Sequence, residues 1–89
     1  MTITPARIST AECAVLDTIR SAGFVESAGW FYFADPERSL VRITVFGGQY
    51  QLWRRRRIGD GWMIICTADV EEFDPRTFAT WCSGWPLIA

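Results

Sequence analysis

Two adjacent glycines, Gly47 and Gly48, separate two segments in which apolar and polar side chains alternate. Alternation with a period of two is typical of strands that bury one face. A two-residue type I′ turn needs positive φ at both central positions, and glycine adopts positive φ without steric cost. The sequence therefore predicts a β-hairpin with strands at about residues 40–46 and 49–57, the second ending in the arginine run 54–57.

Similar signals extend the sheet on both sides of this hairpin. Residues 30–33 are aromatic throughout and lead into an Asp-Pro turn at 35–38. Gly59-Asp-Gly61 then reverses the chain into a last strand at about residues 62–67. The expected sheet is a four-stranded antiparallel meander.

A helix is expected before the sheet and another after it. Ser9 and Glu12 can form a capping box in front of an apolar stripe, so the first helix is placed at about residues 10–22. Asp74-Pro75 combines an N-cap with proline at the first helical position, and Pro86 follows the end of the second helix. The predicted class is α+β in the order α-β-β-β-β-α, with both helices packed on one face of the sheet.

Composition limits the broad class of the protein. The 89 residues suit one compact domain over residues 1–89, and a hydrophobic fraction of 49% allows it to bury a core. A net charge of −1 argues against a polycation that coats nucleic acid. The three cysteines lack Cys-x-x-Cys spacing and are odd in number, so they are expected to be small buried apolar residues in a reducing cytoplasm. No apolar run approaches the ~18 residues of a membrane span, so a soluble protein without a membrane partner is expected.

The register of the central hairpin assigns side chains to two faces of the sheet. With the two glycines in the turn, Ile43 faces Leu52 on the apolar face expected to pack on the helices. Arg42 then faces Trp53 on the opposite face, here called the outer face.

The first expected strand is placed by pairing Phe33 with Leu40 across the Asp-Pro turn. This register assigns Trp30 and Tyr32 to the core face. It assigns Phe31 and Phe33 to the outer face.

Strand alternation also divides the arginine run. Arg54 and Arg56 are expected to turn toward the helices and serve structure, whereas the other two arginines join the outer face. Aromatic residues and arginine are enriched in binding hot spots, although arginine stems can also simply cover aromatic rings on a solvated sheet face. The candidate partner-binding residues are Phe31, Phe33, Arg42, Trp53, Arg55 and Arg57, with Phe46 on the same face.

Four acidic residues fall within positions 69–74. Asp69, Glu71 and Glu72 form a candidate secondary acidic patch that could bind a divalent cation or mimic phosphates. The segment lacks the Asp-x-Asp-x-Asp-Gly spacing of a calcium loop, and the chain has no histidine. A solvated loop whose acids complement the dipole of the next helix is the favoured interpretation, so no metal and no cofactor are expected.

Enzyme classes have little support in the sequence. The absence of histidine excludes Ser-His, Cys-His and His-metal sites. The glycine pair lies in a hairpin rather than between a strand and a helix, so it is not a phosphate cradle. The sequence therefore favours a non-enzymatic protein.

Two binding functions fit these features. In the first, the chain is an inhibitor or adaptor that docks its outer face, or an edge strand, on a larger protein; such small chains are common among phage and mobile-element inhibitors, including anti-CRISPR proteins. In the second, the same face binds RNA or single-stranded nucleic acid through stacking aromatics and arginine-phosphate contacts. Net negative charge favours the protein partner. A homodimer through a free edge strand is a further use of the sheet.

The order of helix, strands and helix resembles that of double-stranded-RNA-binding domains. Those domains begin their last helix with lysines, whereas Glu71-Glu-Phe-Asp-Pro75 stands at this place here. Such acids would repel phosphate, so RNA binding is not carried over from the resemblance.

Overall fold

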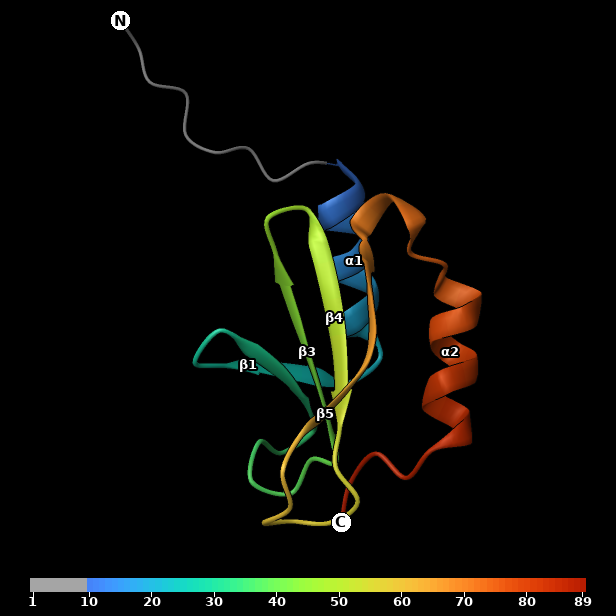
Figure 1. Ribbon diagram of the computed structural model, residues 1–89. Helices are drawn as coiled ribbons and strands as arrows, with labels where there is room; N and C mark the ends of the chain where they lie inside the picture. Colours follow the sequence, from blue (N-terminus) through green and yellow to red (C-terminus); the bar gives the residue numbers. More distant parts are fainter. Residues whose placement is uncertain (1–9) are drawn as a thin grey trace, which may run out of the picture.

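The protein is an α+β domain with two helices and a five-stranded antiparallel sheet (Figure 1). The structure, a computed structural model, describes residues 10–89, so Ser9 of the expected capping box lies outside the described residues. The strand order β1-β2-β3-β4-β5 follows the chain, which makes the sheet a meander. The elements are α1 (Thr10–Ser21), β1 (Phe24–Ser27), β2 (Trp30–Phe33), β3 (Val41–Phe46), β4 (Gln49–Arg54), β5 (Met63–Asp69), the 3-10 turn η1 (Val70–Glu72) and α2 (Pro75–Gly84).

Strand β1 was not expected from the sequence, and it raises the strand count from four to five. It pairs antiparallel with β2 through a tight turn at Ala28 and Gly29, whose φ angles are 52° and 84°. Alanine rarely adopts positive φ because its Cβ approaches the following carbonyl oxygen, so Ala-Gly is a weak hairpin signal. With β1 in place, β2 becomes an inner strand and β1 one of the two edges.

The central hairpin has the expected register. Gly47 and Gly48 occupy its turn with φ of 62° and 77°. Ile43 lies opposite Leu52, and both side chains are buried. Arg42 lies opposite Trp53 on the other face, so the assignment of faces within this hairpin is confirmed.

The register between β2 and β3 differs by one residue from the expected one. Phe31 lies opposite Ile43, and because side chains alternate along a strand, this shift moves every side chain of β2 to the other face. Phe31 is only 4% exposed, and Phe33 packs against the core. The expected placement of Phe31 and Phe33 on the outer face is therefore wrong, and Trp30 and Tyr32 lie there instead.

Ser39, in the loop between β2 and β3, holds this register. Its side chain is fully buried, and its hydroxyl oxygen accepts hydrogen bonds from the amides of Phe33 (2.9 Å) and Val41 (3.3 Å). The amide of Leu40 donates to the carbonyl oxygen of Leu87 at 2.8 Å, so the C-terminal segment closes the same loop. The backbone amides of Phe33, Leu40 and Val41 thus have hydrogen-bond partners although the pairing between β2 and β3 is interrupted there.

Both helices pack on the same face of the sheet. Val15 and Ile19 of α1 and Phe78 of α2 belong to one buried cluster with side chains of the sheet. Neither helix covers the opposite, outer face. The buried members of the cluster are Val15, Ile19, Phe24, Phe31, Val41, Ile43, Leu52, Val70 and Phe78.

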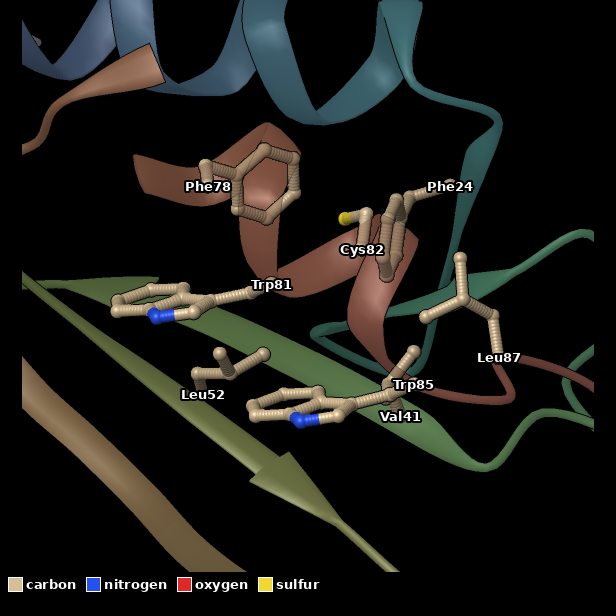
Figure 2. A pocket seen from close by; sticks show the side chains of 8 residues that line it. All are labelled: Phe24, Val41, Leu52, Phe78, Trp81, Cys82, Trp85 and Leu87. Carbon is tan, nitrogen blue, oxygen red and sulfur yellow. The ribbon is translucent and has the colours of Figure 1, made fainter. Parts of the chain in front are cut away.

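Large aromatic side chains attach α2 to the sheet (Figure 2). Trp81 of α2 and Trp85, the residue that follows the helix, have parallel rings 6.4 Å apart and lie beside Leu52 and Val41. The space left among these side chains is only about 10 Å³, close to the minimum for one water molecule. The guanidinium carbon of Arg54 lies 5.0 Å from the centre of the Trp85 ring, just beyond the end of α2, so Arg54 turns toward the helix side of the sheet as expected of a structural arginine.

The corrected face of β2 can be tested with two phenylalanines. We expect Phe31→Ala to lower the free energy of unfolding by about 3–5 kcal/mol, because it opens a cavity in the core. Phe46→Ala is the matched control: Phe46 is 85% exposed, so its loss should change stability by about 0.5 kcal/mol or less. Urea titration followed by circular dichroism measures both. If Phe31→Ala does not fold, Phe31→Leu should still cost more than Phe46→Leu, and equal costs would contradict the register.

Tyr50 is buried on the core side of β4, with its ring 5.3 Å from that of Phe73 in an edge-to-face contact. Burial of the phenol, reinforced by the nearby Cys66 and Glu72, raises the pKa of Tyr50 to about 12. A tyrosine in an unfolded chain has a pKa of about 10. Since the folded state holds this proton more tightly, its contribution to stability is present below about pH 10 and is lost as the pH rises toward 12.

A spectroscopic titration tests this assignment, because the chain has two tyrosines. In Tyr32→Phe, Tyr50 is the sole tyrosine, and its absorbance near 295 nm should titrate at about pH 12 while the protein stays folded. Tyr50→Phe should lose less stability than the wild type between about pH 10 and 12. A midpoint near 10 in the folded protein would contradict the burial argument.

Candidate functional site

The outer face of the sheet carries a group of half-buried aromatic and arginine side chains that we call the Trp/Arg cluster. Four of its members come from β2, β3 and β4, and the other two lie in the connection between β4 and β5. They are Trp30, Tyr32, Arg42, Trp53, Arg55 and Trp62.

Cross-strand pairing builds a row through the middle of this cluster. Val25 of β1 lies opposite Tyr32, and Tyr32 lies opposite Arg42. Arg42 lies opposite Trp53, which lies opposite Ile64 of β5. The row therefore crosses all five strands, with an arginine in the centre and exposed aliphatic side chains at both ends.

Arg42 is enclosed by three indole rings. Its guanidinium carbon lies 3.9 Å from the centre of the Trp30 ring, 4.6 Å from Trp62 and 5.6 Å from Trp53. Trp30 and Trp53 also contact each other edge to face at 6.0 Å. Each cation–π contact contributes about 0.5–1 kcal/mol when exposed and ~2 when desolvated, so these rings restrain the guanidinium strongly.

Arg55 approaches the same cluster from the end of β4. Its guanidinium carbon lies 4.4 Å from the centre of the Trp62 ring, and its Nε donates to the carbonyl oxygen of Ser39 at 3.1 Å. Trp62 also contacts Tyr32, with ring centres 6.3 Å apart. Arg55 is therefore held by the loop that sets the register of β2.

Arg57 does not join the cluster. Strand β4 ends at Arg54, so strand alternation no longer places the side chains beyond it. Arg57 instead pairs with Asp60 at 3.3 Å, in an exposed contact of the kind that contributes little to stability. Arg56 is exposed in the same loop and was expected to face the helices.

The structure thus gathers half of the residues expected at the site. Arg42, Trp53 and Arg55 come together, and Phe31 and Phe33 lie on the core side. Three cluster members, Trp30, Tyr32 and Trp62, were missed by sequence reasoning. Residues 24–27 (Phe-Val-Glu-Ser) do not alternate and Ala28-Gly29 is a weak turn signal, so the sequence does not indicate β1 or the inner position of β2. The place of Trp62 follows an irregularity in the β4–β5 pairing at Leu52 and Trp53, for which the sequence also has no signal.

The rest of the outer face is more polar. Thr44, Phe46, Gln49 and Gln51 line an open hollow next to the cluster. The Gln51 side-chain oxygen accepts a hydrogen bond from the Trp53 indole at 3.2 Å, which links the hollow to the aromatic rings. Phe46 lies on this face as expected and is 85% exposed.

The acidic segment is mainly a connection between β5 and α2. Asp69, Glu71 and Glu72 are exposed, and Asp69 accepts a hydrogen bond from the Gln49 side chain at 3.4 Å. Asp74 caps α2 by accepting from the amide of Arg76 at 3.0 Å. Within residues 10–89, no group of three or more His, Cys, Asp or Glu residues is arranged to hold a metal ion.

Two further features of the described residues bear on the class of protein. The thiols of Cys13, Cys66 and Cys82 are free, and burial raises the pKa of Cys82. The expected burial of all three is wrong, because Cys13 is exposed on α1 and the other two are half-buried. In the part of the chain that the structure describes, no helix has the length and apolar character needed to cross a bilayer.

No protein-family model matches this chain, and neither a curated protein nor a solved structure matches it. What the protein binds is therefore inferred from its own surface.

A double-mutant cycle can measure how firmly the rings hold Arg42. We expect Arg42→Met and Trp30→Leu to show a coupling of about 0.5–2 kcal/mol in the free energy of unfolding, because the two side chains are in cation–π contact. The control cycle combines Arg56→Met with Trp30→Leu and should show none. Urea unfolding provides the four stabilities in each cycle. Equal coupling in the two cycles would mean that the contact does not hold Arg42 in solution.

Proposed function

We propose that this chain is a small non-enzymatic binding protein, an inhibitor or adaptor, that docks the Trp/Arg cluster on a larger protein. The observation that carries the proposal is the row through Arg42 on a sheet face that neither helix covers. Tryptophan, tyrosine and arginine are the residues most enriched at hot spots of protein interfaces. The exposed side chains of Val25 and Ile64 extend the apolar surface around them.

Restraint of the cluster also supports a docking role. The guanidinium of Arg42 is held by rings on several sides, and Trp53 is fixed by its bond to Gln51. A side chain that is already ordered loses little conformational entropy when a partner binds. The surface is thus preorganised in the free protein.

A protein partner is favoured over nucleic acid because the tryptophan rings already contact arginines of the same chain. Bases stack on open aromatic faces, whereas the rings of Trp30 and Trp62 are already in contact with the chain's own arginines. The net charge of −1 adds no long-range attraction for phosphate. Nucleic-acid binding through the same face is the alternative that the test below separates.

Two variants that each add one negative charge test the proposal. Ile64→Glu places a charge at the end of the central row, and Ala79→Glu places one on the exposed side of α2. In a pull-down from a lysate of the native host, read by mass spectrometry, a partner captured by the wild type should be lost with Ile64→Glu and kept with Ala79→Glu. Trp53→Ala should also lose it, provided that the variant remains folded.

Two results would contradict the proposal. One is a partner that both glutamate variants retain, which would place the binding surface elsewhere. The other is an oligonucleotide that binds the wild type with a steep dependence on salt and is lost with Ile64→Glu, because that pattern would favour the nucleic-acid alternative.

A further inference from the structure

Two positive charges at the centre of the Trp/Arg cluster form no ion pair with a carboxylate of residues 10–89. Arg42 and Arg55 both contact the ring of Trp62, at 4.6 Å and 4.4 Å. Their guanidinium groups are therefore closer together than the screening length of ~10 Å at 0.1 M salt. Among residues 10–89, the one ion pair between side chains joins Arg57 and Asp60, so neither cluster arginine is neutralised there.

Arg42 carries a second sign of an incomplete site. Its Nε is buried and has no hydrogen-bond partner among the described residues. A buried donor without an acceptor costs about 1–3 kcal/mol, and such groups are rare in native structures. The indole rings in contact with this guanidinium supply no acceptor oxygen.

We infer that Arg42 and Arg55 together receive the carboxylate of an Asp or Glu side chain of the partner protein, one that is set among apolar residues. The inference rests on the proposed function and names the chemistry of its partner. Charge complementarity supplies the attraction, and a planar carboxylate matches the planar donor edge of a guanidinium. Tyr32 lies opposite Arg42 and Ile64 lies opposite Trp53, and these two side chains would contact the apolar residues next to the acid.

The rings explain why one carboxylate suits this site better than a chain of phosphates. Arg42 contacts three rings and Arg55 contacts one, and both side chains are half-buried, so the site offers a localised anion contact rather than a basic groove. Asp69, at the other end of the outer face, would also repel a polyanion laid across the sheet. In a site partly shielded from water, a single charge-assisted contact is stronger than at an open surface.

Selection of random peptides tests the inference without a known partner. Short peptides displayed on phage would be selected on the immobilised full chain, and binders that Ile64→Glu abolishes would be kept. We expect these binders to share an Asp or Glu flanked by aliphatic or aromatic residues. For a synthetic copy of one binder, replacing its acid by the matching amide should weaken binding about tenfold or more.

A double-mutant cycle between the protein and the peptide identifies the residue that binds the acid. Arg42→Gln should weaken binding of the acidic peptide by a similar factor. It should leave binding of the amide peptide nearly unchanged, because that peptide no longer carries the negative charge that Arg42 would contact. Arg42→Lys, which keeps the charge but not the planar donor edge, should fall between the two. Arg56→Gln removes the same charge from the exposed loop and is the matched control, with affinity unchanged. Thermal unfolding of each variant confirms that it is folded.

The outcomes separate the inference from the proposed function. Binders that Ile64→Glu abolishes but that need no acid would overturn the inference and leave the docking face in place. Failure to select any binder sensitive to Ile64→Glu would count against both. If replacing the acid by its amide weakens binding to the wild type and to Arg42→Gln by the same factor, Arg42 is not the residue that binds the acid.

Discussion

The buried hydroxyl of Ser39 determines how β2 lies against β3, and the outer face of the protein depends on that register. The hydroxyl oxygen accepts hydrogen bonds from the backbone amides of Phe33 and Val41, so both amides have partners where the loop joins the sheet. Phe31 then faces the helices and completes the core, while Trp30 and Tyr32 face the other way. A slip of one residue would reverse both faces of β2, burying the tryptophan and exposing the phenylalanines.

Stacked arginine and tryptophan recur on the two faces of the sheet, with different results. On the core face, Arg54 lies on Trp85 beneath α2, so the contact closes the edge of the core. On the outer face, Arg42 lies among three half-buried rings that neither helix covers. The arginine–tryptophan contact therefore stabilises the fold on the core face and orders an uncovered surface on the outer face. The two faces differ because the helices pack on the core face alone.

The outer face accordingly combines two properties that a solvated sheet face does not need. Its side chains are ordered in advance by their mutual contacts, and its central charges remain uncompensated by residues 10–89. The first property lowers the entropy lost on binding, and the second selects the charge of what binds. Together they tie the proposed docking role to an acidic contact on the partner.

Local conformational preferences were enough to predict the helices and the central hairpin. Gly47-Gly48 specifies positive φ, Asp74 caps its own helix, and the period-two alternation places Ile43 and Leu52 on one face. Sequence alone did not reveal the Ala28 turn, the register of β2 or the irregularity that brings Trp62 beside Arg42. The Ala28 turn has a weak local signal, and the loop that fixes the register of β2 is closed by contacts between distant segments, such as Leu40 with Leu87, which local preferences do not report. Half of the candidate site, Arg42, Trp53 and Arg55, thus follows from the sequence, and the rings that enclose its arginines were decided by the tertiary structure.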